Sequence, residues 1–143
     1  MLIPQSIVEY CDGIKYENYK TNTPKKFQKH QHNTRDSELM MSMLAEKVGV
    51  EREYLDYVFF SVCKGAEEHT DILPREIFHD TTYVIPVILP EGNSVITAED
   101  DHVVVNTGMI CEFDHTKPHS MQLDDIESGC VVIMVAVKKH LLH

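Results

Sequence analysis

The sequence predicts a mainly β fold, a jelly roll with an N-terminal helix packed outside it. Its 143 residues fit a single domain, 1–143, and 43% hydrophobic with 25% charged residues is ordinary globular composition. Apolar residues recur at helical spacing just before Gly49, and short β-branched and aromatic runs separated by turns follow it. A helix followed by an all-β body is the pattern of a sandwich or jelly roll.

The N-terminal part divides into an arm and a helix. We expect 1–35 to be an irregular arm, because one apolar stretch, 3–10, is followed by a polar, Lys-rich segment typical of a surface loop. The segment 36–55 holds the predicted buttressing helix, which we expect over 37–48 because Gly49 ends it. Its apolar residues at helical spacing are Leu39, Met40, Met43, Leu44 and Val48.

The remaining residues, 56–139, form the predicted jelly-roll core. Turn signals divide it, such as the Asn106-Thr107-Gly108 run. Eight runs read as strands because they are rich in β-branched and aromatic residues or have extended character. They are 57–63, 69–72, 83–89, 94–98, 102–105, 109–113, 119–123 and 130–137.

Charge and cysteine content exclude several function classes. Asp and Glu outnumber Lys and Arg by 23 to 13, a net charge of -10, which disfavours nucleic acids and anionic membrane surfaces as partners. The chain has no run of about 20 apolar residues, and its first residues do not resemble a signal peptide. The four cysteines lack paired metal-ligand spacing and read as buried thiols in a reducing compartment. We therefore expect a cytoplasmic protein.

The run His69-Thr70-Asp71 carries the clearest chemical signal. In an extended backbone, residues two apart point to the same face, so His69 and Asp71 can present an imidazole and a carboxylate to one metal ion. Two His and one carboxylate on one face leave coordination positions open, as in non-haem Fe(II) oxygenases. His102, His115 and His119 are the candidates for the third ligand.

The order of features around this run resembles that of the 2-oxoglutarate- and Fe(II)-dependent dioxygenases, most closely the prolyl-hydroxylase-like branch. The shared order is a strand, a glycine turn, His-x-Asp, a strand ending in Leu-Pro-Glu-Gly, then Gly-x-x-x-x-Phe-Asp and a His. It covers about residues 56–139. The resemblance implies a double-stranded β-helix and makes His69, Asp71 and His119 the catalytic iron ligands. His115, inside the turn after the Phe-Asp pair, is the second choice.

The resemblance also implies an activity. The cofactor is Fe(II), and 2-oxoglutarate and O₂ are consumed to hydroxylate a substrate, either a peptide side chain or a small metabolite. The family's basic anchor for 2-oxoglutarate, about ten residues past the last His, is missing here. Substitutes in this sequence are Lys138, Lys64 and Arg75, and Tyr83 supplies a hydroxyl donor.

A second function class stays open. A small jelly roll of this kind also fits a metal-binding, cupin-like binding module without oxygenase activity, which the missing anchor favours. The His-x-Asp run, in place of a cupin's His-x-His, argues against an ordinary cupin. The segments 20–35 and 72–82 are the expected lids over the site. The sequence gives no indication of the oligomeric state or of the substrate's identity.

Overall fold

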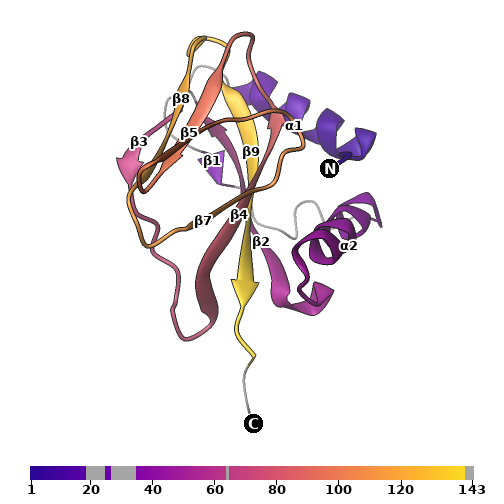
Figure 1. Ribbon diagram of the computed structural model, residues 1–143. Helices are drawn as coiled ribbons and strands as arrows, with labels where there is room; N and C mark the ends of the chain where they lie inside the picture. Colours follow the sequence, from indigo (N-terminus) through magenta and orange to yellow (C-terminus); the bar gives the residue numbers. More distant parts are fainter. Residues whose placement is uncertain (19–24, 27–34, 64, 141–143) are drawn as a thin grey trace.

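The protein stacks a layer of helices, a five-stranded sheet and a four-stranded sheet (Figure 1). The computed structural model describes residues 1–18, 25–26, 35–63 and 65–140. The first sheet has the order β1-β2-β9-β4-β7, formed by Lys25–Lys26, Leu55–Cys63, Cys130–Lys138, Phe78–Ile88 and Cys111–Asp114. The second has the order β3-β8-β5-β6, formed by Ala66–His69, His119–Leu123, Ser94–Ala98 and Asp101–Val104. All of these neighbours pair antiparallel, as a jelly roll requires.

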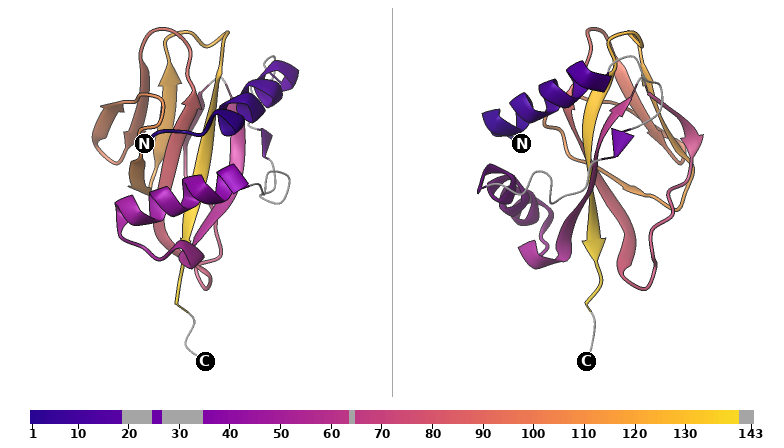
Figure 2. Two further views of the ribbon diagram at one scale, coloured as in Figure 1. Left: turned by 90° about the vertical axis from the view of Figure 1, so that its right-hand side faces the viewer. Right: turned by 180° about the vertical axis from the view of Figure 1, so that it is seen from behind.

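Both helices lie across the outer face of the five-stranded sheet (Figure 2). The helix α2, Arg35–Val48, confirms the helix predicted over 37–48 and begins two residues earlier. It ends at Gly49, whose φ of 74° is a backbone conformation that glycine adopts without a Cβ penalty. A 3₁₀ turn, η2, Arg52–Tyr54, then leads into β2.

The prediction of an irregular 1–35 arm was wrong for its first half, because Gln5–Asn18 forms the helix α1. The carbonyl of Pro4 accepts the amides of Ile7 and Val8 at its start. Ile7, Cys11 and Ile14 lie at i, i+4 and i+7, and all are buried in the core. Packing of this narrow apolar stripe therefore stabilises a helix whose sequence is otherwise polar and contains a glycine.

Two hydrophobic cores flank the five-stranded sheet. The core under the helices takes the alternate residues Val131, Ile133, Val135 and Val137 of β9. The core between the two sheets takes Cys130 and Val132 of the same strand, with residues from β4, β5 and β8. Since both faces of β9 are covered, its sequence is an unbroken apolar run rather than an alternation.

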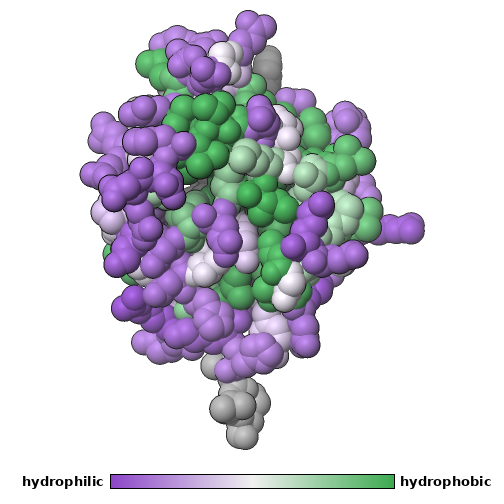
Figure 3. All heavy atoms as spheres, viewed as in Figure 1, coloured by the Kyte–Doolittle hydropathy of each residue, from purple (hydrophilic) through white to green (hydrophobic). Residues whose placement is uncertain are grey.

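The jelly-roll class predicted from the sequence is confirmed, with the predicted strands 94–98 and 119–123 found at those bounds. The bounds of the other predicted strands differ, most of all for β3, which lies earlier than the predicted 69–72, and for β4, which begins at Phe78. The surface is mixed, with hydrophilic groups at the left and lower margins of the face in Figure 3 and apolar groups toward its centre. Within the described residues, none of the helices combines the length and apolar character needed to span a membrane.

Candidate metal centre

His69 and His119 face one another across two neighbouring strands. They are register partners, the last residue of β3 and the first of β8. Along β8, His119, Met121 and Leu123 are the buried positions, so this alternation points His119 into the space between the sheets. Register partners share a face, and the two imidazole centroids lie 4.4 Å apart with planes inclined by 58°.

Gly65 allows β3 to approach β8 this closely. Its φ is 103°, and a Cβ at this position would lie 2.8 Å from the carbonyl oxygen of Met121. Any larger residue therefore has to push β3 away from β8. The glycine turn noted in the sequence thus has a direct role, because it brings His69 to His119.

Asp71 lies between the two imidazoles. Its Oδ1 is 3.4 Å from Nε2 of His69, and its Oδ2 is 3.1 Å from Nε2 of His119. One nitrogen or oxygen from each residue lies within 4.8 Å of the others. The backbone amide of Asp71 donates a 2.9 Å hydrogen bond to the carbonyl of His115, which fixes the chain just past β3.

Backbone carbonyls orient both histidine rings in the same way. Nδ1 of His69 lies 2.6 Å from the carbonyl oxygen of Glu67, and Nδ1 of His119 lies 2.9 Å from that of Lys117. A carbonyl only accepts, so each Nδ1 carries the hydrogen and each Nε2 is directed at Asp71. Second partners of this kind hold metal-ligating histidines in one tautomer and orientation.

The charges of the three side chains favour a cation at this point. Burial disfavours the charged carboxylate of Asp71, but the hydrogen bond from His119 and the charges of His119, His69 and His115 outweigh it and lower its pKa. Burial also disfavours imidazolium at His119, yet the bonds to Asp71 and to the Lys117 carbonyl raise its pKa. A proton on Nε2 thus bridges His119 and Asp71 where a metal ion would displace it.

The donor set fits a divalent transition metal. Once the bridging proton is displaced, two imidazole nitrogens and one carboxylate direct lone pairs at one point, and these are the ligands that Fe(II) takes in a facial arrangement. The side chain of His69 is 43% exposed and that of His119 only 8%, so the site opens on the His69 side. On the inner side the ring of Phe113 packs against His119 with centroids 4.6 Å apart.

The structure separates His115, the second choice as third ligand, from this trio. His115 is 1% exposed, and its Nε2 lies 3.1 Å from the carbonyl oxygen of His79. Its backbone amide donates to the carbonyl of Asp80, and its own carbonyl accepts from Asp71. It therefore joins the turn before β8 to the segments that flank the site.

The predicted co-substrate residues do not gather at the trio. Tyr83 is buried in the core under the helices, the face of the sheet opposite to the inter-sheet space. Lys138 lines a cleft together with Tyr83 and His79, and none of the three ligand candidates lines that cleft. Arg75 is exposed and pairs with Asp80 at 3.2 Å. Lys64 lies outside the described residues.

Three residues beside the site escaped the sequence analysis. Phe113 contacts His119, Ala98 is the register partner of His119 on β5, and the amide of Glu99 donates to the carbonyl of Pro118. Phe113 belongs to the Phe-Asp pair of the family resemblance, and that motif was the sequence signal that could have placed Phe113 near the site. For Ala98 and Glu99 the sequence holds no signal, because their proximity depends on the β5–β8 register.

Comparison with known proteins adds little to this geometry. No family model matches the sequence, and no curated protein matches it. A cupin-2 domain protein from Shewanella frigidimarina aligns at 11% identity over 94% of this chain and 99% of its own, with a TM-score of 0.43. A predicted oxalate decarboxylase from Thermotoga maritima aligns at 14% over 97% and 100% (TM-score 0.36), and Fe(II) HppE at 9% over 74% and 77% (TM-score 0.36).

Proposed function

We propose that this protein is a mononuclear Fe(II) oxygenase that uses 2-oxoglutarate and O₂ to hydroxylate a peptide side chain or a small metabolite. The observation that carries the proposal is the convergence of His69, Asp71 and His119 on one point at the edge of the inter-sheet space. Bound there, iron supplies the redox chemistry that no side chain provides.

The residues of this chain hold and shelter that chemistry. His69 and His119 present Nε2 because backbone carbonyls hold their Nδ1 hydrogens, and Asp71 supplies the negative charge. Phe113 packs on the inner side of His119 and limits the access of water to that side of the ring. Three protein ligands leave room for a co-substrate and O₂ on the exposed His69 side.

The proposed reaction couples the oxidation of 2-oxoglutarate and of the substrate to the reduction of O₂. 2-Oxoglutarate loses CO₂ and gains one oxygen atom of O₂ to become succinate, while the other oxygen atom enters a substrate C–H bond as hydroxyl. The four electrons that reduce O₂ come in equal shares from the co-substrate and the substrate. The residues of this chain have to hold the co-substrate and the substrate next to the same metal ion.

A second candidate is a metal-binding module without oxygenase activity. The observation that favours it is that, among the described residues, only histidine charges act on Asp71, so the trio has no Lys or Arg partner for a dicarboxylate. Arg75 is paired with Asp80 instead. A buried carboxylate without a cationic partner is costly, so 2-oxoglutarate binding is the step that separates the two candidates.

Anaerobic titration with Fe(II), then with 2-oxoglutarate, tests the proposal. The expected result is iron binding, a visible charge-transfer band on adding 2-oxoglutarate, and succinate release when O₂ and a substrate are supplied. His69→Ala and Asp71→Asn should lose iron binding, while the exposed controls His102→Ala and Asp100→Asn keep it. Iron binding with no response to 2-oxoglutarate would favour the metal-binding module over the oxygenase. Absence of iron binding would rule out both candidate functions.

A further inference from the structure

A cleft separate from the metal centre lies on the face of the five-stranded sheet that is turned toward the helices. Its volume is about 430 Å³, which is in the range of sites that hold small molecules. The strands β4, β7 and β9 supply one side of it, and the connection from α2 to η2 supplies another. Its lining includes Val50, Tyr54, Tyr83, Glu112, Val137 and His140, and none of the three metal-ligand candidates lines it.

Tyr83 brings a hydroxyl without a partner to this cleft. The residue is only 6% exposed and yet lines the cleft, so the surface that it keeps opens there. Within the described part of the chain its hydroxyl has no hydrogen-bond partner, although polar groups buried to this degree normally have one. Burial and the nearby charge of Glu112 raise the pKa of the Tyr83 phenol. The hydroxyl therefore keeps its proton at neutral pH and can donate a hydrogen bond.

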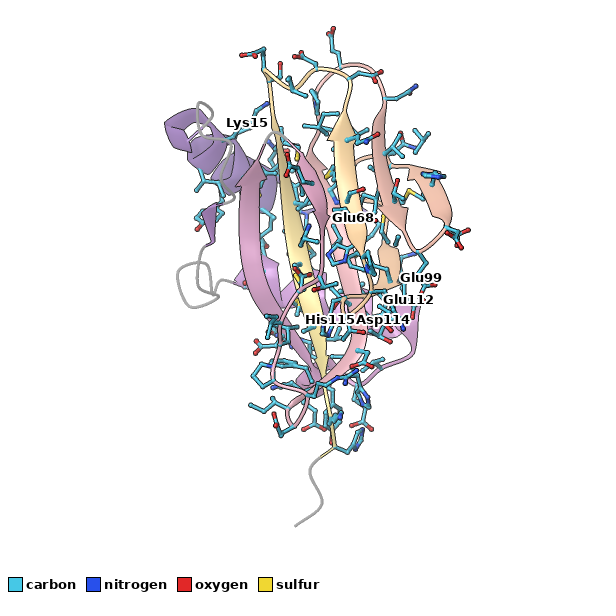
Figure 4. All side chains as sticks on the ribbon, turned by 90° about the vertical axis from the view of Figure 1, so that its left-hand side faces the viewer. Lys15, Glu68, Glu99, Glu112, Asp114 and His115 are labelled. Atoms are coloured by element: carbon cyan, nitrogen blue, oxygen red, sulfur yellow. The ribbon has the colours of Figure 1, made fainter. Side chains whose placement is uncertain are left out.

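Glu112 places a carboxylate beside this hydroxyl. The two residues are register partners on β7 and β4, so their side chains share one face with Cβ atoms about 5 Å apart. Glu112 lies on the edge strand of the five-stranded sheet, where Figure 4 labels it next to Asp114. Its carboxylate is exposed and forms no ion pair with another described residue. A hydrogen-bond donor and a charged acceptor thus stand side by side without bonding to each other.

This pair matches the two charged groups of an α-amino acid. A carboxylate accepts a hydrogen bond from the Tyr83 hydroxyl, and an ammonium group donates one to Glu112. Because both groups are attached to one carbon, they can reach the two neighbouring side chains together. Lys138 also lines the cleft, so its lining carries charges of both signs. A simple amine would leave the Tyr83 hydroxyl without an acceptor, and Glu112 would repel a simple carboxylate.

The rest of the cleft suits an apolar side chain. Val50 and Val137 line it, and Val137 belongs to the core under the helices. Tyr54 and His140 line it as a stacked pair, with ring centroids 3.8 Å apart and planes inclined by 21°. Aliphatic and ring surfaces of this kind gain from covering an apolar group and lose from desolvating a charged one.

We propose that this cleft binds a free α-amino acid with an apolar side chain, whose carboxylate meets Tyr83 and whose ammonium group meets Glu112. The inference does not depend on the proposed function, because the cleft contains none of His69, Asp71 and His119. Experiments on the metal-free protein therefore test it, and the result of the iron titration does not bear on it.

Titration of the full-length, metal-free protein with L-leucine and two matched analogues tests the proposal. The analogue 3-methylbutylamine lacks the carboxylate, and 4-methylpentanoate lacks the ammonium group. With valine methyl groups labelled, the signals of Val50 and Val137 report occupancy of the cleft. L-leucine should shift both signals and bind at least about fivefold more tightly than either analogue, because each analogue loses one charge-assisted hydrogen bond.

Two variants assign the charged groups of the ligand to their partners. Tyr83→Phe should weaken L-leucine binding by about two- to fivefold and leave 3-methylbutylamine binding unchanged, since the amine has no carboxylate. Glu112→Gln should weaken both of these ligands by about two- to fivefold and should not weaken 4-methylpentanoate. Glu46→Gln, at an exposed position of α2, is the matched control and should change none of the three.

Several results would overturn the inference. They are an absence of L-leucine binding, equal binding of L-leucine and the two analogues, L-leucine binding that both variants leave intact, and shifts confined to valines away from the cleft. Thermal unfolding shows whether Tyr83→Phe, a change at a buried residue, still folds. If it does not fold, Glu112→Gln decides the outcome, because Glu112 is exposed.

Discussion

The carbonyl of His115 accepts the backbone amide of Asp71 at 2.9 Å, although the two residues belong to distant parts of the chain. Asp71 lies just past the end of β3, so the pairing of β3 with β8 does not hold it. The hydrogen bond to His115 lets the turn before β8 position the Asp71 carboxylate. The same turn carries Lys117, whose carbonyl orients His119. One short segment, 114–119, therefore sets the geometry of two of the three candidate ligands.

Replacing His115 should weaken metal binding although His115 is no ligand. His115→Leu removes the ring N–H that faces the carbonyl of His79, and leaving that carbonyl buried without a donor costs about 1–3 kcal/mol of stability. Displacement of Asp71 should lower metal affinity by about 10–100-fold, as for other outer residues of metal sites. Equilibrium metal titration and urea unfolding measure the two effects.

The conservative variant separates position from simple destabilisation. His115→Gln retains an N–H able to reach the His79 carbonyl, so it should recover most of the metal affinity lost in His115→Leu. His102→Leu, at an exposed histidine that hydrogen-bonds to Thr97 on the neighbouring strand, is the matched control and should bind metal normally. Metal affinity that is unchanged in His115→Leu would contradict the positioning role.

Substitution at Gly65 should damage both the fold and the site. Gly65→Ala places a Cβ against the Met121 carbonyl in a backbone region that L-residues rarely adopt, at a cost of about 1–3 kcal/mol. Because β3 must then move from β8, His69 should leave His119 and metal affinity should fall. Gly13→Ala is the control, because Gly13 lies within α1 and an added Cβ would meet no atom within 4 Å. It should stabilise the protein by about 0.5–1 kcal/mol. Thermal unfolding and metal titration of the two variants test the contrast.

The stability of the metal-free protein should depend on pH through the Asp71–His119 pair. The lowered pKa of Asp71 gives a contribution present above the ordinary value of 3.8 and lost as pH falls through the lowered pKa. The raised pKa of His119 gives one present below 6.5 and lost as pH rises through the raised pKa. The pair therefore stabilises most between these two ordinary values.

Urea unfolding of chelator-treated protein across that pH range measures the effect. Wild type should lose the pair's contribution on both sides of the window, and His119→Gln should flatten the dependence on the alkaline side. Asp71→Asn should flatten it on the acid side. If the variants follow the wild-type curve at a constant offset, the pair is not the source of the pH dependence.

A divalent metal should stabilise the folded chain. A ligand that binds only the folded state at one hundred times its Kd adds about 2.7 kcal/mol. Wild type should therefore unfold at a higher temperature with anaerobic Fe(II), and a chelator should reverse the gain. His69→Ala should show no gain, whereas His102→Ala should match wild type. A gain that survives in His69→Ala would place the metal elsewhere.

Local sequence patterns predict much of the fold. The apolar periodicity of α2 and the β-branched runs between glycine and proline turns predict a helix and eight strands, because each pattern reports a local geometry. The helix α1 was missed, because its stability comes from burying Ile7, Cys11 and Ile14 against a sheet that forms from distant residues. The strand β1 pairs with β2 through two residues only, too few for any sequence pattern.

The sequence by itself determined the jelly-roll class and the pairing of His69 with Asp71, since an extended backbone places residues two apart on one face. Only the tertiary structure decided that His119, and not His115, completes the trio, because strand register selects the partner of His69. It also decided that Tyr83 lies in the core on the other side of the sheet, away from the trio. Register and layer packing join residues far apart in sequence, and no local pattern encodes which of them meet.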